Sequence, residues 1–546
     1  MKEMVGMRVA GTARGSFAIK QAAAALLMVL GSWLFYDQWI GATLGGFALA
    51  WLVVLVVAVR PVRRNRQAMI AVLVAAFFAV TLIEAPGLLG WTLFWTAIGS
   101  AALLPRRRFD DAWRWLNRLV FATGYGLARP ILDAKQLAKI RTRRRHTNIG
   151  RVAAVLALPV IGGAVFIALF AGANPLIGEM LGRVEPASPV GLIPRLVVAS
   201  LIGLAIWPTL RPHPFSTRIE LREASMGRGL PVPVISITLS LVTFNAIFAL
   251  QNLSDIVFLW SGAPLPGQVT LADYAHRGAY SLIATALLAG LFVLTALRPG
   301  SESASRPAIR ALVALWVAQN LFLVASSMLR TWDYVQAYSL TGLRIAALAW
   351  MMLVAVGLVL ICWRLLAGKS SGWLINRNAL AAGLVLAATC VVDLGSVASH
   401  WNVRHAREVG GAGQHLDLCY LRQQGPSALT ALAELETRVT TPVLLDRIRA
   451  VRSDILDTVE YSQSDWHSWT WRNARRLAAA KAALGATPPT AAHAPNGRDC
   501  DGTPFREPEP VPPASVASPD AATPTPIEGA PQPPSPTPSP LTGAAR

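Results

Sequence analysis

Charged residues are scarce in this chain, and their scarcity excludes a single soluble globule. Only 15% of the 546 residues are charged and 53% are hydrophobic, whereas a soluble domain carries about 25% charged residues. The apolar residues form repeated runs, each long enough to cross about 30 Å of hydrocarbon as a helix. These runs predict an all-α, polytopic transmembrane helix bundle.

Recognisable catalytic motifs are also absent. Neither a Gly-rich, phosphate-cradling loop nor a Ser/His/Asp arrangement stands out. Competent zinc ligands do gather after residue 400, but their spacing fits no compact ligand pattern. We therefore predict no catalytic residue, no metal site and no cofactor, and the balance leans against an enzyme. The residues considered for zinc are His400, His405, His415, Asp417 and Cys419.

Cysteine is rare, with four residues in the whole chain. Cys362 and Cys390 lie in apolar runs, and Cys419 and Cys500 lie beyond them. A disulfide between the last two is permitted if this part of the chain is outside the cytoplasm. Nothing in their spacing supports it.

In the first 400 residues, acidic residues are far fewer than basic residues. The net charge is +20, but the segment after residue 400 holds 14 of the 50 basic and 15 of the 30 acidic residues. The excess therefore belongs to the membrane part, where basic residues mark cytoplasmic loops. No clustered basic face with a recognisable module is visible, so we predict no nucleic-acid partner.

The apolar runs predict about eleven spans, with an uncleaved first helix, a cytoplasmic N-terminus and an extracytoplasmic C-terminus. The expected spans are 21–40, 42–59, 68–83, 88–104, 152–172, 190–207, 233–250, 278–297, 308–328, 343–366 and 378–398.

These spans divide the chain into five segments. Seventeen of the 37 prolines fall after residue 485, and such a composition cannot bury enough apolar surface to fold. The segments are a four-helix membrane segment (1–104), a basic cytoplasmic amphipathic loop (105–151), a seven-helix membrane domain (152–400), a small extracytoplasmic helical domain (401–485) and a disordered Pro-rich tail (486–546).

The basic loop is expected to lie on the cytoplasmic face of the lipid bilayer. Apolar residues recur in it at helical spacing, so its arginines would face anionic headgroups. Retention in the cytoplasm explains the same charges without a specific lipid, and we prefer that simpler interpretation. No protein partner is identified from the sequence. The arginines concerned are Arg141, Arg143, Arg144 and Arg145.

Amide side chains are the main polar groups within the spans. Hydrogen bonds between helices explain them at least as well as a substrate path does, so we expect them to serve packing. They are Asn245, Gln251, Asn252, Gln319 and Asn320.

The outward loops before the eighth and tenth spans carry a denser set of Arg, Asp and Tyr residues. Arg near an apolar boundary needs an acceptor, so we expect one paired network at the outer surface, acting either as a structural clamp, which we prefer, or as an anion site. The candidates are Asp273, Tyr274, Arg277, Arg330, Asp333, Tyr334, Tyr338, Thr341, Arg344 and Asp393.

These residues also carry a family resemblance. Together with Asn402-Val403, Leu416-Asp417, Tyr420-Leu421 and Asp465-Trp466, they resemble the bacterial integral membrane proteins grouped as domain of unknown function 4173, or the related 4153, over roughly residues 230–475. Ser339 stands where that pattern has Gly. The resemblance implies a bacterial inner-membrane protein without an established activity, and it supplies no catalytic residues.

Three functions stay open. The first is a non-enzymatic envelope protein that couples the bundle to its outer domain as a sensor, scaffold or regulatory partner. The alternative, a transporter of a small or anionic substrate, predicts a polar site at the midplane. A membrane-embedded transferase on a lipid-linked substrate ranks last, because the outer acids Asp37 and Glu84 are isolated in the sequence.

Overall fold

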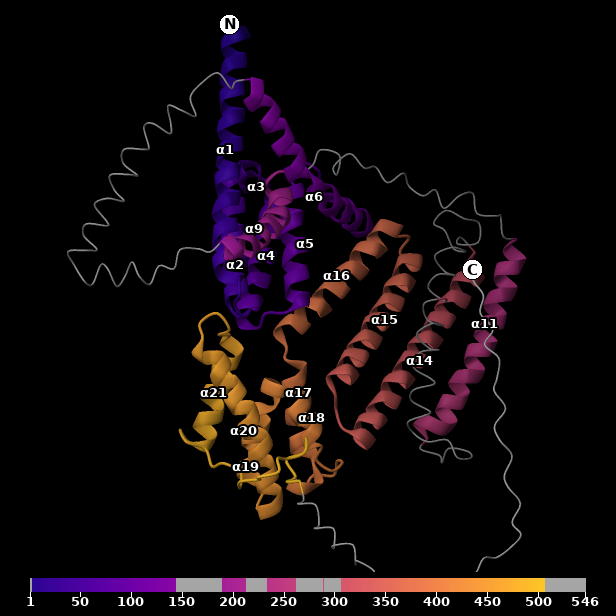
Figure 1. Cartoon of the computed structure of the whole chain (residues 1–546). Coiled ribbons are helices and arrows are strands. Elements are labelled where there is room, and N and C mark those ends of the chain that lie inside the picture. Colours follow the sequence, from indigo (N-terminus) through magenta and orange to yellow (C-terminus); the bar gives the residue numbers. More distant parts are fainter. Residues whose placement is uncertain (1, 144–188, 213–232, 262–287, 289–305, 506–546) are drawn as a thin grey trace, which may run out of the picture.

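The computed structural model describes residues 2–143, 189–212, 233–261, 288 and 306–505 (Figure 1). Within these ranges the chain is helical, and one isolated β-bridge joins Arg498 to Pro504. The helices that precede the C-terminal domain are α1 (Lys2–Phe35), α2 (Thr43–Ala58), α3 (Arg60–Arg64), α4 (Arg66–Glu84), α5 (Leu88–Leu103), α6 (Ala112–Arg143), α9 (Pro189–Leu210), α11 (Val234–Asp255) with the π-helix Ile256–Trp260, α14 (Pro307–Tyr338), α15 (Gly342–Leu366) and α16 (Ser371–Val391).

The predicted all-helical membrane protein is confirmed. Seven helices of the described ranges are long and apolar enough to cross a membrane, and two shorter apolar helices, α2 and α5, accompany them. They coincide with nine of the eleven expected spans. The expected spans 152–172 and, apart from residue 288, 278–297 lie outside the described residues.

The first group of helices packs around Trp51. Helices α1, α2, α4, α5 and α9 enclose its fully buried ring, which meets Phe47, Trp91 and Phe94. The indole nitrogen of Trp51 donates to the Thr209 hydroxyl at 3.0 Å. A buried indole with a satisfied N–H fixes the position of α9 against α2.

The second group consists of α11, α14 and α15, and amides join its first two members. Gln319 donates to Asn245 at 3.1 Å, and Asn252 donates to the Gln319 carbonyl at 3.2 Å. These two hydrogen bonds join α11 to α14, as the packing interpretation expects, while the side-chain oxygens of Asn252, Gln319 and Asn320 are buried without a hydrogen-bond partner in the described part. Helix α16 runs between the two groups in Figure 1 and contacts α15, α5 and α6.

The last span departs from its predicted range. Residues 378–398 were expected to form it, but α16 already ends at Val391 and a second helix, α17 (Leu394–His405), follows after a bend. The reason is Asp393, whose carboxylate accepts a hydrogen bond from the Ser396 N–H at 3.2 Å and begins the new helix.

Helix α17 opens the C-terminal domain, whose apolar core is separate from those of the membrane helices. Figure 1 shows the domain beyond one end of the bundle, opposite the N-terminus of α1. Its other helices are α18 (Leu418–Gln423), α19 (Leu429–Arg438), α20 (Pro442–Ser464) and α21 (Trp471–Leu484), with the short 3₁₀ turns Arg407–Val409 and Gly425–Ala428 between them.

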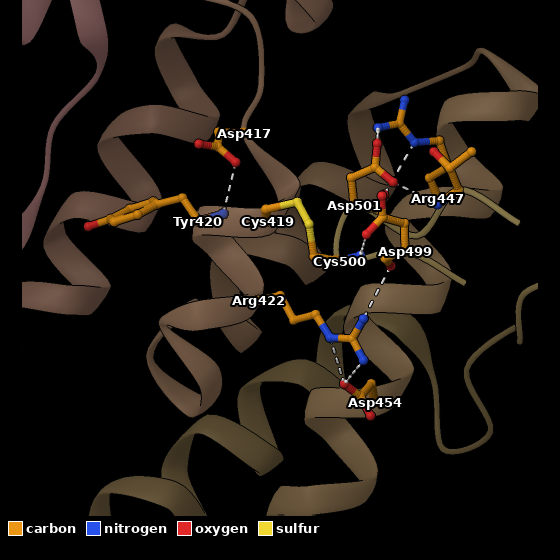
Figure 2. Close-up of a disulfide and its surroundings, with 10 residues drawn as sticks. Asp417, Cys419, Tyr420, Arg422, Arg447, Asp454, Asp499, Cys500 and Asp501 are labelled. Atoms are coloured by element: carbon orange, nitrogen blue, oxygen red, sulfur yellow. Dashed lines mark hydrogen bonds and ion pairs between the residues drawn. A yellow bond between two sulfur atoms is a disulfide. The ribbon is translucent and has the colours of Figure 1, made fainter. Parts of the chain in front are cut away.

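The start of the Pro-rich tail is ordered, which corrects the expected boundary at residue 486. A disulfide joins Cys419 of α18 to Cys500 (Figure 2). Nearby, Arg498 pairs with Asp446 at 2.7 Å, and Arg447 pairs with Asp501. The cross-link and these ion pairs hold a segment that lacks the apolar surface to fold alone. Residues 506–546 lie outside the described part.

Candidate functional site

The corner between α14 and α15 brings together four of the predicted site residues. The Tyr334 and Tyr338 rings lie 4.7 Å apart, and the Arg344 guanidinium lies 4.3 Å above the Tyr334 ring. The same guanidinium donates to the carbonyls of Tyr338 and Ser339, and the Thr341 hydroxyl accepts from the Arg344 N–H at 3.3 Å. Arg344 therefore braces the corner.

Ser339 occupies the tightest point of this corner. Its φ is +68°, in the left-handed region that favours glycine. The Arg344 bond to its carbonyl helps to hold a serine in that conformation.

The backbone of the corner is hydrogen-bonded to side chains of the C-terminal domain. The Asn402 side chain accepts from the Leu340 N–H at 2.7 Å and donates to the Leu340 carbonyl at 2.8 Å. Two residues further along the chain, the Gly342 N–H donates to the Tyr420 hydroxyl at 3.4 Å. Partial burial raises the pKa of Tyr420, which keeps its hydroxyl neutral.

Asp393 forms a second contact point, at the end of α16. Its carboxylate pairs with Arg476 of α21 and accepts from the Ser427 hydroxyl at 3.1 Å. Burial alone would raise the pKa of Asp393, but Arg476 and the hydrogen bonds from Ser396 and Ser427 hold it below its ordinary value. The group is therefore a stable carboxylate at neutral pH.

Glu84, the last residue of α4, forms the third contact point. It pairs with Arg472 at 3.4 Å and with Arg475, both on α21. Arg472 also donates to the Val391 carbonyl at 3.0 Å, at the C-terminus of α16. A cation at this position satisfies an open carbonyl and opposes the negative end of the helix.

The turn between α1 and α2 forms the fourth contact point. The Ala42 N–H donates to the Trp469 carbonyl at 2.7 Å, and the Trp33 and Trp466 rings lie 5.4 Å apart. A Cβ at Gly41 would overlap backbone oxygens of the 467–469 turn. This approach therefore requires glycine.

We call these four contact points the latch. It joins residues 41–42, Glu84, 340–342 and 391–393 at the ends of membrane helices to α17, α18, α21 and the 467–469 turn. A small pocket of about 130 Å³ lies beside it, lined by Gln336, Ser339, Asn402 and His405 among others. The latch joins the C-terminal domain to the membrane helices.

The remaining predicted residues have separate places. Arg330 pairs with Asp255 in a buried contact between α14 and α11, and Asp333 lies half-buried on α14. In the described part of the chain Arg330 pairs with Asp255, Asp393 pairs with Arg476, and Arg344 donates to backbone carbonyls. None of these partners was predicted from the sequence. Residues outside the described part, or with side chains outside it, are Asp273, Tyr274, Arg277, Arg141, Arg143, Arg144 and Arg145.

The arginines of the latch were not predicted from the sequence. Arg472, Arg475 and Arg476 share one face of α21 because they are three and four residues apart. That spacing was a usable signal for a charged docking face. In the described part of the chain, no group of three or more His, Cys, Asp or Glu residues could hold a metal ion.

A family model described as "Domain of unknown function (DUF4153)" matches residues 67–435. It is one of the two related families indicated by the motifs, and the match begins well before residue 230. It includes Glu84 and Asp393 and ends within α19, before α21. No curated protein and no solved structure matches the chain.

Proposed function

The chain belongs to the DUF4153 family, and from its structure we propose that it is a non-enzymatic envelope protein that displays its C-terminal helical domain in a fixed position on the membrane bundle. In this role the domain is a scaffold or regulatory surface for another component of the envelope. The latch carries the proposal, because four contact points from distant parts of the chain fix one domain.

We place the protein in a bacterial inner membrane, with its N-terminus in the cytoplasm and the C-terminal domain outside. All four latch positions belong to span ends that the charge bias assigns to the outside. The Arg-rich ends of the helices lie away from the latch. At one of them, the Asn376 side chain accepts a hydrogen bond from the Ala112 N–H in the basic loop region at 2.8 Å. The Cys419–Cys500 disulfide also favours an oxidising compartment.

A scaffold is favoured over the two alternatives by how the polar groups are used. Glu84, which a transferase could use as a catalytic acid, is held by two arginines. Asn245 and Gln319, which a transporter could use at the midplane, bond to each other. Groups committed to structural contacts support a fixed assembly.

The test is to lock and to break the latch in cells. Glu84→Cys with Arg475→Cys, in a chain where Cys362 and Cys390 are serine, can be joined by a short bifunctional thiol reagent. A fixed scaffold keeps its cellular phenotype when the pair is joined. The same phenotype should be lost in Glu84→Arg, which repels α21, and restored when Arg472→Glu and Arg475→Glu are added.

A matched control is Lys481→Glu on the same helix, whose partner Glu460 lies within the domain. This change should leave the phenotype intact. Loss of function on locking the latch would show that the domain must move, and would contradict a fixed scaffold.

A further inference from the structure

Buried oxygen atoms without hydrogen-bond partners gather where α11 meets α14. In the described part of the chain they are Asn252 Oδ1, Asp255 Oδ2, Gln319 Oε1 and Asn320 Oδ1. Asn252, Asp255 and Asn320 are 8%, 0% and 1% exposed. Buried acceptors in proteins are nearly always paired, so four of them in one place indicate a bound group that satisfies them.

The helices place these oxygens at one level of the bundle. Asn252 and Asp255 are three residues apart, so they share the buried face of α11. The Asn252 amide donates to the Gln319 carbonyl at 3.2 Å, which puts Gln319 and its neighbour Asn320 beside them on α14. Gln319 stands about 18 Å along α14 from Pro307, near the middle of a hydrocarbon layer about 30 Å thick.

The backbone of α11 is irregular at the same level. The α-helix ends at Asp255, and the π-helix Ile256–Trp260 follows directly, with the Ser261 N–H donating to the Ile256 carbonyl at 3.2 Å. Single π-turns in helices are frequent at functional sites, and the ends of interrupted membrane helices coordinate Na⁺. This irregularity is a second indication of a ligand, independent of the side-chain oxygens.

The chemistry of the four oxygens favours a monovalent cation. A single water molecule can donate only two hydrogens, whereas one cation contacts several oxygens at once. The other oxygen of Asp255, Oδ1, accepts from the Gln251 amide at 3.1 Å and pairs with Arg330. One carboxylate shared with an arginine, together with neutral amide oxygens, offers too little negative charge for a divalent ion such as Ca²⁺.

We propose that these four oxygens bind one Na⁺ ion, which joins α11 to α14 near the middle of the membrane. The ion satisfies acceptors that burial would otherwise leave without a partner. It is part of a fixed bundle and lies apart from the latch, so this proposal and the scaffold role can fail independently.

The test measures the binding of radioactive sodium to the purified full-length protein in detergent, with choline chloride holding the ionic strength constant. The wild type should bind about one Na⁺ per chain. Its melting temperature should rise by about 2 °C or more when Na⁺ replaces choline, because the ion binds the folded state alone.

Asn320→Leu removes one of the four oxygens at nearly constant side-chain volume. The Kd for Na⁺ should rise by about tenfold or more, the loss that follows when even an outer partner of a metal ligand is removed. The matched control is Asn378→Leu on α16. Asn378 donates to the Leu374 carbonyl four residues before it at 3.0 Å, just as Asn320 donates to the Trp316 carbonyl at 2.7 Å, and this variant should bind Na⁺ like the wild type.

Two results would overturn the proposal. One is a wild type that binds no sodium above the choline background, which would leave water as the group at these oxygens. The other is an equal affinity for Na⁺ in Asn320→Leu and Asn378→Leu. Should Asn320→Leu fail to fold, sodium binding and the melting temperature of the wild type still decide the proposal.

Discussion

Removing the charge of Asp393 should loosen the C-terminal domain from the membrane helices. Asp393→Asn keeps the shape of the side chain and its ability to accept from the Ser396 N–H, so the change isolates the ion pair with Arg476. The side chains of Arg476 and Asp393 are 13% and 21% exposed. An exposed pair contributes about 0–1 kcal/mol, and removing one partner of a fully buried pair costs about 3–5 kcal/mol.

The burial of this pair lies between those limits. Asp393→Asn should therefore lower the free energy of unfolding by about 2 kcal/mol. A double-mutant cycle with Arg476→Gln should give a coupling energy of about 1–2 kcal/mol. The control is Lys481→Gln, whose pair with Glu460 is 41% and 43% exposed and should contribute about 0.5 kcal/mol or less.

The pH dependence follows from the lowered pKa of Asp393. A carboxyl whose folded-state pKa is lowered stabilises the protein above its unfolded pKa, about 3.9, and loses that contribution as the pH falls below it. The stability lost between about pH 5 and pH 3 should thus be smaller in Asp393→Asn than in the wild type.

Denaturant titration of the purified protein measures these effects. The loosening of the C-terminal domain is detected by its cleavage in limited proteolysis. A coupling energy below about 0.3 kcal/mol, the limit expected for independent sites, would refute the reasoning. So would an Asp393→Asn variant that matches Lys481→Gln in stability and in pH dependence.

Three further predictions concern other parts of the molecule. Cys500→Ser should destabilise the C-terminal domain by about 2–4 kcal/mol, measured by its denaturation midpoint. The wild type should change mobility on a gel when reduced, and unchanged mobility would contradict the disulfide. Ser339→Gly should stabilise the protein by up to about 1 kcal/mol, and Ser339→Val should destabilise it, because φ is +68° there; equal melting temperatures would contradict the strain. Asp255→Leu should cost about 3–5 kcal/mol by leaving Arg330 buried without its carboxylate, and Asp255→Leu with Arg330→Met should recover most of that loss in a thermal melt.

Local sequence signals predicted the parts of the structure that depend on local chemistry. Runs of apolar residues located the membrane helices, and Asp393 was expected to pair with an Arg. The left-handed conformation of Ser339 was not predicted, although a departure from an expected Gly had been noted there. The apolar runs depend on residues close together in the chain.

Long-range pairing could not be predicted in the same way. Glu84 looked isolated because its partners, Arg472 and Arg475, stand almost 400 residues later. Asp255 lies beyond residue 250, where the span was expected to end, whereas α11 runs to Asp255 and a π-helix continues to Trp260. The ordered start of the tail depends on Cys419, 81 residues before Cys500.

The most direct test of the latch joins its sides in cells with a reagent that cannot cross the inner membrane. Glu84→Cys with Arg475→Cys, in a chain where Cys362 and Cys390 are serine, is treated with a membrane-impermeant bifunctional thiol reagent while the inner membrane is intact. A latch outside the cytoplasm predicts a shift in electrophoretic mobility before lysis. A shift that needs lysis would contradict the orientation, and no shift in either case would contradict the latch itself.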